Sequence, residues 1–428
     1  MLINNGRIID PSQGIDLVGD ILVINGKIEQ IGQGLTSSNC PIINAAGMIV
    51  SPGFIDLHCH LRQPGFEEKE TIATGTKAAA RGGFTTICCM PNTNPPIDSR
   101  DMVKYIQETA AREGVVRVLP IGCITKGRAG GELVEMGKLA DAGVVGFSDD
   151  GSPVENPKLM RQALEQSKIL GLPIIAHCED LSLTKGGLMN EGKVAAKLGF
   201  KGMPPLAEER IIARDISLAE QTEGRLHIAH VSTSGSVELI RQAKAKGISL
   251  TAEVTPHHLT LTEESVLSCG ANAKVNPPLR TQDDINALIR GLEEGVINAI
   301  ATDHAPHSEK DKAGDFGQAA FGISGLETAL GSLLSLVHQG KISLLTLISK
   351  LTIEPARVLG IAERAGTLKT GSPADIVIFD PKAEWVVNPD EFASKGKNTP
   401  LKGATLKGKV MATVVGGKVV YLDKKLTN

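Results

Sequence analysis

The sequence has few aromatic residues, no paired cysteines and no large excess of charge. Phe, Trp and Tyr make up 3% of the 428 residues, whereas Gly, Ala, Ile, Leu and Val are plentiful, as in closely packed α/β proteins. The formal net charge of -3 argues against a nucleic-acid-binding protein or a polybasic membrane-binding protein. The seven cysteines have no disulfide spacing and no Cys-x-x-Cys motif, which favours a reducing cytoplasm.

Long apolar runs and targeting segments are also missing. No stretch approaches the roughly 18 consecutive apolar residues that a membrane-spanning helix needs. Residues 1–5 are strand-like and lack the basic segment and apolar stretch of a signal peptide. We therefore expect a soluble cytoplasmic protein that acts on neither membranes nor nucleic acids.

Both ends of the chain have the pattern of short β-strands. Near the N-terminus, Asn25-Gly26 separates two apolar runs and suits a type I′ hairpin turn. Near the C-terminus, Gly416-Gly417 separates two further strand-like runs. The pattern predicts one small β-sandwich domain assembled from residues 1–52 and 362–428, although two unrelated β caps would look the same.

Residues 53–361 alternate short apolar runs with helix-forming segments. Residues 71–81 are rich in Ala and Lys, and apolar residues recur at helical spacing in 157–170 and 206–219. The eight candidate strands are residues 54–57, 84–90, 116–121, 144–147, 173–176, 226–229, 248–254 and 297–301. Eight such alternations predict an α/β protein with a (β/α)₈ TIM barrel. A doubly wound open sheet is the alternative, weakened because no glycine-rich phosphate loop follows the first run.

Side chains that can bind metal ions follow five of the eight apolar runs. The first run ends at His58-Cys59-His60, where the spacing of two puts both imidazoles on one face of a strand. Asp149-Asp150, His177, His230 and Asp303 follow later runs. The carboxyl ends of barrel strands converge on one face, so four histidines and two aspartates could hold two adjacent divalent ions, with zinc favoured by imidazole. Any one of them could be structural, but five coincidences are far less expected.

The same periodicity sets other histidines apart. His227 lies three residues before His230, so on a regular strand it is expected to face the helices. His304 alternates away from Asp303 and is expected behind the metal ligands. His257-His258 could line the mouth of the barrel or form a polar loop pair, and the pattern leaves both open.

Four motifs together resemble those of the dihydroorotases, most closely the longer bacterial class (type I) of the amidohydrolase superfamily. The resemblance covers essentially the whole chain and implies a cyclic amidohydrolase. The implied reaction is the reversible, zinc-dependent cyclisation of N-carbamoyl-L-aspartate to L-dihydroorotate and water, the third step of de novo pyrimidine (UMP) biosynthesis. The motifs are His58-Cys59-His60-Leu61-Arg62, Met90-Pro91-Asn92-Thr93-Asn94-Pro95, Phe147-Ser148-Asp149-Asp150-Gly151 and Ala301-Thr302-Asp303-His304-Ala305-Pro306-His307.

The resemblance also assigns metal ligands. It implies His58, His60 and Asp303 on a first zinc ion, His177 and His230 on a second, and Asp150 bridging both together with a hydroxide. Many relatives bridge their metals with a carbamylated lysine, but no lysine occurs between Lys138 and Lys158, so an aspartate is the natural substitute. Alternation at a strand end cannot choose between Asp149 and Asp150, whereas the family motif favours Asp150. Asp303 is the expected catalytic residue, taking a proton from the hydroxide and passing it to the leaving ring nitrogen.

The substrate keeps a free carboxylate that needs an anchor. Arg62 offers a planar fork for bidentate pairing, with a surface salt bridge as the alternative. The resemblance adds Asn92 and His307 at this carboxylate, and Asn276 with the backbone of Phe321-Gly322 at the pyrimidine ring. The full expected substrate-binding set is His60, Leu61, Arg62, Asn92, Asn276, His307, Phe321 and Gly322.

Residues 308–317 are polar, contain two glycines and follow a catalytic strand. This pattern predicts a mobile lid over bound substrate, with an ordinary solvated loop as the alternative.

Two other functions are alternatives to a dihydroorotase. A hydantoinase or allantoinase would use the same metals, but the missing lysine and the presence of Arg62 and Asn92 count against it. A non-catalytic subunit that scaffolds aspartate transcarbamoylase should have lost ligands, and all six are present. A homodimer is expected by analogy, and a catalytic subunit that also binds aspartate transcarbamoylase is compatible with the sequence.

Overall fold

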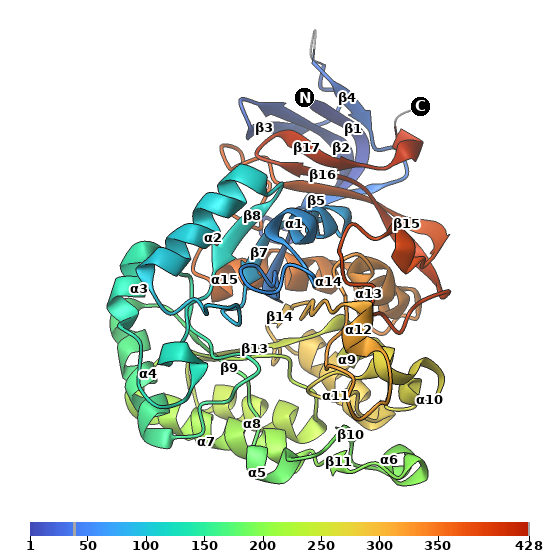
Figure 1. Ribbon diagram of the computed structural model, residues 1–428. Helices are drawn as coiled ribbons and strands as arrows, with labels where there is room; N and C mark the ends of the chain where they lie inside the picture. Colours follow the sequence, from blue (N-terminus) through green and yellow to red (C-terminus); the bar gives the residue numbers. More distant parts are fainter. Residues whose placement is uncertain (37–39, 427–428) are drawn as a thin grey trace.

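The computed structural model describes residues 1–36 and 40–426, and it consists of a barrel of parallel strands with a separate sheet lying over it (Figure 1). Across these residues, no helix combines the length and apolar character needed to cross a bilayer.

The barrel strands lie where the apolar runs predicted them, with one exception. Three strands pair in parallel in one sheet and four in a second, in the order β14-β13-β12-β9. These strands are β6 (Phe54–Cys59), β7 (Phe84–Cys89), β8 (Arg117–Pro120), β9 (Ile174–Ala176), β12 (Leu226–Ile228), β13 (Leu250–Val254) and β14 (Ala299–Ile300). A short two-stranded ribbon, β10 (Met189–Asn190) with β11 (Gly202–Met203), lies outside the barrel order.

The fourth run, residues 144–147, forms no regular strand, which corrects that part of the prediction. Only Phe147 pairs there, with Gly122 on one side and Ile174 on the other, and this pairing joins the two sheets. The run is too short for a ladder because the chain turns at Ser148 into the loop that carries Asp149 and Asp150. On the opposite seam Cys59 pairs with His304, so the strands close into the predicted (β/α)₈ barrel.

Local sequence explains where the main barrel helices start and stop. Thr71 caps α1 through a capping box with Thr74, and Asn156 caps α4 ahead of a proline in its first turn. Gly171 ends α4 in the left-handed conformation, with φ of 67°. The helices around the barrel are α1 (Ile72–Arg81), α2 (Arg100–Glu113), α3 (Met136–Ala142), α4 (Pro157–Leu170), α7 (Leu206–Thr222), α8 (Ser234–Ala245), α11 (Gln282–Glu293), α13 (Ala329–His338), α14 (Leu344–Leu351) and α15 (Ile353–Val358).

The remaining helices are short and lie in the loops. They are α5 (Leu181–Thr184), α6 (Lys193–Leu198), α9 (Pro256–Thr260), α10 (Ser265–Cys269) and α12 (Glu309–Lys312).

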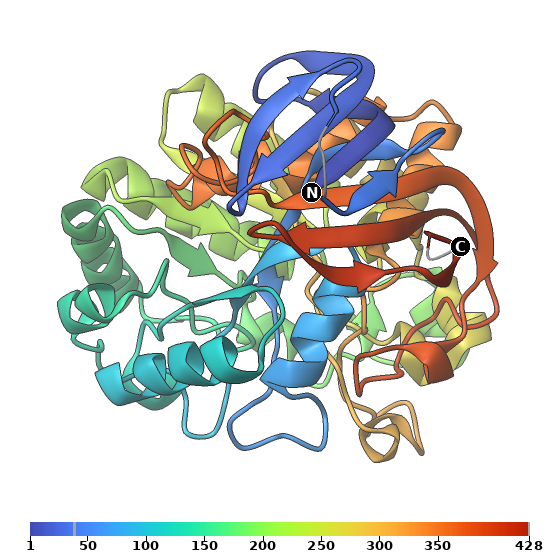
Figure 2. The ribbon, with the colours of Figure 1, turned by 90° about the horizontal axis from the view of Figure 1, so that it is seen from above.

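The second sheet is built from both ends of the chain, whose strands lie side by side when seen from above (Figure 2). Its antiparallel seam joins β5 to β15, with Ser51 opposite Val377. Asn25-Gly26 and Gly416-Gly417 form the expected tight turns, all four residues having positive φ. The strands are β1 (Leu2–Asp10), β2 (Ile15–Ile24), β3 (Lys27–Gly32), β4 (Ile42–Asn44), β5 (Ile49–Pro52), β15 (Ile376–Val386), β16 (Thr405–Val415) and β17 (Lys418–Leu422). The division at residues 52 and 362 stays a prediction.

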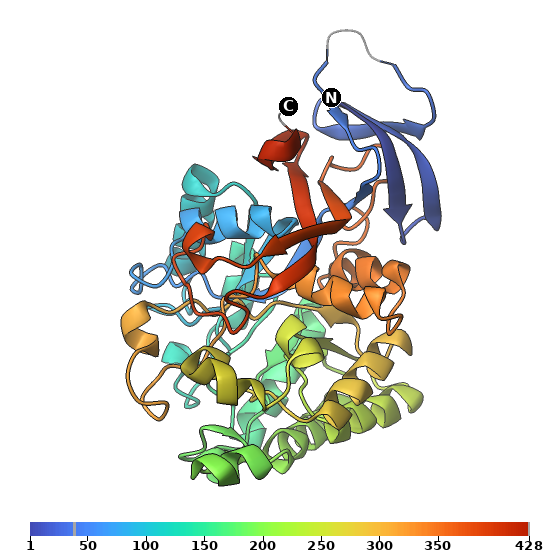
Figure 3. The ribbon, with the colours of Figure 1, turned by 90° about the vertical axis from the view of Figure 1, so that its right-hand side faces the viewer.

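The sheet packs directly against the barrel through one face of strand β15. Along β15, Val377 and Phe379 face the barrel core, whereas Ile376 and Ile378 face a separate core within the sheet. Figure 3 shows this sheet lying beside the outer helices of the barrel, and its strand β16 contacts α1 and α13. Both cores therefore depend on the same backbone segment.

Candidate metal centre and active site

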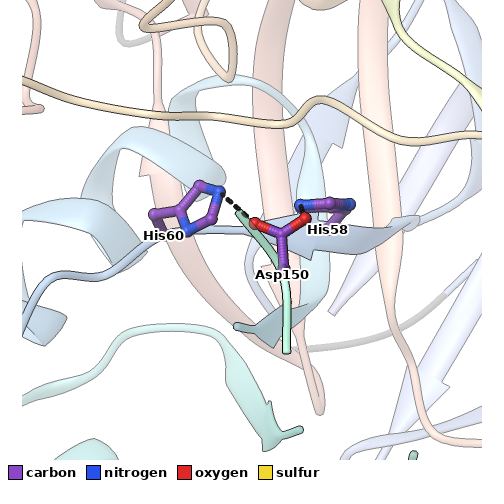
Figure 4. Close-up of side chains that lie close together, drawn as sticks. All are labelled: His58, His60 and Asp150. Atoms are coloured by element: carbon purple, nitrogen blue, oxygen red, sulfur yellow. Dashed lines mark ion pairs between the residues drawn. The ribbon is translucent and has the colours of Figure 1, made fainter. Parts of the chain in front are cut away.

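The six expected metal ligands meet at the carboxyl ends of the barrel strands. Two groups of potential ligand atoms overlap there, His58-His60-Asp150 and Asp150-His177-His230, and within each group the atoms lie within 4.8 Å of one another. Figure 4 shows the Asp150 carboxylate between the rings of His58 and His60. All six side chains are buried, with at most 7% of any residue exposed.

Asp150 occupies the shared position between the two groups. Its Oδ1 lies 3.3 Å from His58 Nε2, 3.5 Å from His230 Nε2 and 3.6 Å from His177 Nδ1. Asp149 turns the other way, and its Oδ1 accepts hydrogen bonds from the backbone N–H groups of Ile124 at 2.8 Å and Thr125 at 3.1 Å. Of the two aspartates, Asp150 thus has its carboxylate among the histidines, whereas Asp149 faces the backbone of residues 124–125.

Asp303 lies against the first pair of histidines. Its Oδ1 is 3.1 Å from His60 Nε2 and 3.6 Å from His58 Nε2. Burial opposes ionisation of this carboxyl, but the hydrogen bond with His60 and the nearby imidazoles hold its pKa well below the usual range. The pKa of Asp150 is lowered in the same way, against its burial, by His58, His177 and His230. Both carboxylates are therefore ionised at neutral pH, the state in which they bind cations.

Each of three ligand rings has its second nitrogen held by a neighbouring side chain. His58 Nδ1 lies 2.9 Å from Glu253 Oε1, and His60 Nδ1 lies 2.8 Å from Asn92 Oδ1. His177 Nε2 lies 3.0 Å from Glu179 Oε2. Because these oxygens accept hydrogen bonds, the opposite nitrogen of each ring presents a lone pair toward Asp150.

The donor set fits divalent metal ions. His58 Nε2 and Asp150 Oδ1 are buried without a hydrogen-bond partner among the described residues, which is costly unless another ligand binds them. Imidazole lone pairs and carboxylate oxygens converging on the same space are typical zinc ligands. The residues present thus suit the metal that the sequence predicted.

A cavity of about 240 Å³ opens above this cluster. Of the expected substrate-binding set, seven residues line it: His60, Arg62, Asn92, Asn276, His307, Phe321 and Gly322. Leu61 does not, because its side chain is only 2% exposed and packs in the hydrophobic core against the α1 backbone at Gly75.

One wall of the cavity carries positive charge. Arg62 Nε donates to the Pro306 carbonyl at 3.2 Å, and the guanidinium lies 3.4 Å from His307 Nε2. His307 Nε2 in turn lies 2.8 Å from the Phe321 carbonyl. Burial lowers the pKa of Arg62 to about 10, so the guanidinium remains a cation at neutral pH.

Two acidic residues belong to the site although the motif analysis did not select them. Glu253 backs His58, and Glu179 accepts from Asn276 Nδ2 at 2.8 Å while also holding His177. The pattern available in the sequence was a single acidic residue within or directly after an apolar run, as in Leu250-Thr251-Ala252-Glu253-Val254. A buried charge in a barrel strand needs partners, and those partners come from distant strands.

The expectation for His227 was wrong. His227 faces the barrel interior, with Nδ1 2.8 Å from Thr251 Oγ1 and Nε2 3.1 Å from Glu253 Oε2. Strand alternation fails because His230 has a positive φ of 34°, so its side chain leaves the regular pleat.

His304, His257 and His258 are also buried near the metal cluster. His304 lies behind the ligands as expected, 3.3 Å from Glu70 Oε2. His257 and His258 begin the short helix α9, and His258 is held by Thr255 Oγ1 and the Pro277 carbonyl. Neither belongs to the cavity lining among the described residues, which favours the polar-pair interpretation.

Comparison with known proteins identifies the family. Residues 49–420 match the model of the amidohydrolase family. The chain is 53% identical to the dihydroorotase of Thermoanaerobacter sp. (strain X514), covering 100% of this chain and 98% of that protein. It is also 53% identical to the dihydroorotase of Geobacter metallireducens, with 98% and 99% covered. The chain belongs to the dihydroorotases of the amidohydrolase family.

The fold of this chain is also similar to that of solved structures outside the dihydroorotases. It superimposes on an L-hydantoinase (dihydropyrimidinase) from Arthrobacter aurescens with a TM-score of 0.89 and 28% identity, covering 98% of this chain and 96% of the other. A D-hydantoinase gives a TM-score of 0.86 at 27% identity, covering 99% and 95%. The resemblance inferred from the four motifs is thereby confirmed, and so is the barrel architecture.

Proposed function

We propose that this protein interconverts N-carbamoyl-L-aspartate and L-dihydroorotate, as a zinc-dependent dihydroorotase of pyrimidine biosynthesis. The observation that carries the proposal is the pair of ligand groups sharing Asp150, placed beneath a cavity that Arg62 lines. Identity of 53% to dihydroorotases over the full chain supports this chemistry.

The residues that would hold two zinc ions divide into two sets that share Asp150. His58, His60 and Asp303 would hold the first ion, and His177 and His230 the second, with Asp150 and a water-derived ligand between them. Ions bound there would lower the pKa of a bound water toward about 7 and polarise the carbonyl of the ring amide.

The chain's own residues supply the proton transfer. In the hydrolytic direction a water oxygen bonds to the amide carbonyl carbon, and the bond from that carbon to the ring nitrogen breaks. The Asp303 carboxylate accepts the proton lost by the water and delivers it to the leaving nitrogen, because it lies on the same side as the first ligand pair. Cyclisation uses the same groups in reverse.

The cavity wall orients the substrate. The Arg62 guanidinium pairs with the free carboxylate, assisted by Asn92 and His307, which line the same cavity. Asn276 would contact the ring from the side of Glu179, to which it is hydrogen-bonded. Phe321 and Gly322 border the ring with their backbone, whereas the buried Leu61 side chain supports the wall from behind.

Hydantoin hydrolysis is the second candidate because the solved neighbours named above are hydantoinases. Two features of this chain disfavour it. The bridging position is Asp150 in a segment without lysine, and the cavity contains Arg62, a partner for a carboxylate that simple hydantoins lack.

We also propose that the protein is a cytoplasmic homodimer and that it binds aspartate transcarbamoylase. Analogy with the family supports the dimer and the partner, and the free state of all seven cysteines agrees with a reducing compartment. Light scattering of the purified protein, alone and mixed with aspartate transcarbamoylase, measures both associations.

Metal analysis combined with an ultraviolet assay of dihydroorotate hydrolysis tests the function. We expect about two zinc ions per chain and activity that is lost on chelation and restored by zinc. An Asp150→Asn variant serves as control and should lose both metal and activity. Bound metal with turnover of hydantoin or allantoin but not dihydroorotate would replace the proposal with the second candidate.

A further inference from the structure

A buried carboxylate lies directly beneath the first ligand pair. Glu253, on β13, is 1% exposed, and its sequence neighbours Ala252 and Val254 are fully buried. A charge in such surroundings is costly unless it is paired and hydrogen-bonded. Its two oxygens are used by two imidazoles, His58 Nδ1 at 2.9 Å and His227 Nε2 at 3.1 Å.

The direction of these hydrogen bonds is fixed by chemistry. An ionised carboxylate only accepts, so both imidazoles must donate to it. His58 therefore carries its proton on Nδ1, and its Nε2 lone pair faces Asp150 at 3.3 Å and Asp303 at 3.6 Å. His227, donating from Nε2, accepts from the Thr251 hydroxyl through Nδ1 at 2.8 Å. Within this hydrogen-bonded group of Thr251, His227, Glu253 and His58, only His58 Nε2 is buried without a partner among the described residues.

We propose that Glu253 is a positioning residue for the first metal ion. Its carboxylate holds the tautomer and the ring plane of His58, and its negative charge strengthens Nε2 as a donor to the ion. His227 and Thr251 hold the carboxylate in turn. The inference rests on the proposed metal-dependent function and adds to it a residue outside the ligand set.

The side chains that hold the other two histidines also contact the substrate cavity or its lining, whereas Glu253 does not. His60 is backed by the neutral amide of Asn92, and Asn92 also lines the substrate cavity. Glu179 backs His177 but is bonded to Asn276, so a change there would disturb substrate and metal together. Among the described residues Glu253 does not line the cavity, and its carboxylate is hydrogen-bonded to His58 and His227, which do not line it either, so its loss should weaken metal binding without a direct effect on substrate binding.

The chain allows the charge to be removed while the hydrogen bonds are kept. In Glu253→Gln the amide oxygen can accept from His58 Nδ1. The amide NH₂ can donate to His227 Nε2 once the proton of His227 moves to Nδ1, where the Thr251 hydroxyl accepts it. Glu253→Leu removes the charge and the hydrogen bonds together. Asp10→Asn is the matched control, because Asp10 is a fully buried carboxylate of the second sheet, bonded to Ser12 and Leu368.

Zinc affinity of the first site is the quantity to measure. A His230→Asn background removes a ligand of the second site, so zinc titrated against a chromophoric chelator reports the first site. Relative to that parent, we expect affinity to fall about tenfold in Glu253→Gln and about a hundredfold in Glu253→Leu, the range typical for partners of metal-bound histidines. Asp10→Asn should bind zinc as the parent does. The visible absorption of bound Co²⁺ should change in Glu253→Gln, and the Tm of the metal-free protein should not fall.

Each outcome separates the two proposals. Zinc binding by Glu253→Gln equal to the parent would overturn the positioning role alone, and so would a weakening that Asp10→Asn reproduces. Absence of zinc binding in the unmutated protein would overturn the metal-dependent function itself.

Discussion

At the scale of single residues, the site depends on side chains that orient other side chains. Asn92 both lines the cavity and holds His60 Nδ1 at 2.8 Å, and Glu179 joins His177 to Asn276. A substitution at such a residue affects metal and substrate together, whereas Arg62 has no contact with a ligand imidazole among its hydrogen bonds. We therefore expect a substitution of Arg62 to alter substrate binding with little effect on the metal cluster.

Arg62→Lys should weaken substrate binding and leave the chemical step largely intact. Lysine keeps the charge but cannot donate to the Pro306 carbonyl and a carboxylate through one planar fork. We expect KM for dihydroorotate to rise at least about tenfold, equivalent to ~1.4 kcal/mol, with kcat changed only a few-fold. Steady-state kinetics measure both.

The matched control for that experiment is Arg112→Lys. Arg112 lies on α2, is 64% exposed and pairs with Glu113, so its replacement should leave KM unchanged. An unchanged KM in Arg62→Lys would remove Arg62 from the carboxylate site.

At the scale of elements, the segment expected to form a lid contains a short helix. Ser308 caps α12 through a capping box with Asp311. Lys312 Nζ donates to the Ala320 carbonyl at 2.8 Å and the Lys274 carbonyl at 3.2 Å, and Phe316 stacks on Phe200 with ring centroids 4.9 Å apart. These contacts, together with hydrogen bonds from Lys274 Nζ to the Phe316 and Gly317 carbonyls, hold the segment beside His307, which lines the cavity.

Substrate should protect this segment from proteolysis. If residues 308–317 close over bound ligand, trypsin cleavage after the exposed Lys310 should slow several-fold when saturating dihydroorotate is added to the metal-loaded protein. Mass spectrometry of the fragments follows the rate. Cleavage after Lys369, in an exposed turn before β15, is the internal control and should not change. Equal rates at Lys310 with and without substrate would mean an ordinary surface loop.

At the scale of the whole molecule, strand β15 of the sheet made from both termini packs one face in the core of the sheet and the other in the core of the barrel. Ile378 contributes to the core of the sheet, and its neighbours Val377 and Phe379 contribute to the core of the barrel. Unfolding of one core therefore removes support from the other. We expect a single cooperative transition.

Ile378→Ala should lower that one transition. Ile378 is fully buried, and the cavity left by this truncation costs about 2–5 kcal/mol. Circular dichroism and release of bound zinc, recorded together during heating, should shift by the same amount. Val386→Ala on the same strand, where the valine is 59% exposed, should change stability by less than about 0.5 kcal/mol. An early transition in Ile378→Ala with zinc retained would show that the sheet unfolds separately.

The sequence by itself determined the barrel, the joint sheet and the six residues gathered at the metal position. Apolar runs and helical spacing are local properties, and a barrel brings all strand ends to one face, so polar residues after the runs had to converge. The spacing of two predicted that His58 and His60 share a face, and both rings do lie beside Asp150, although the pairing of β6 with β7 shifts register between Asp56 and Cys59.

Only the tertiary structure decided which side chains turn inward where the backbone leaves the strand. The choice of Asp150 over Asp149 depends on the turn after Phe147, and the inward position of His227 depends on the positive φ of His230. The side chain of Leu61 points into the core because α1 packs against it. Glu253 stood out only as a single acidic residue within an apolar run, and its contact with His58, 195 residues away, forms only when the barrel closes. Hydrogen bonds between distant strands are set by packing, and a local sequence pattern carries no record of them.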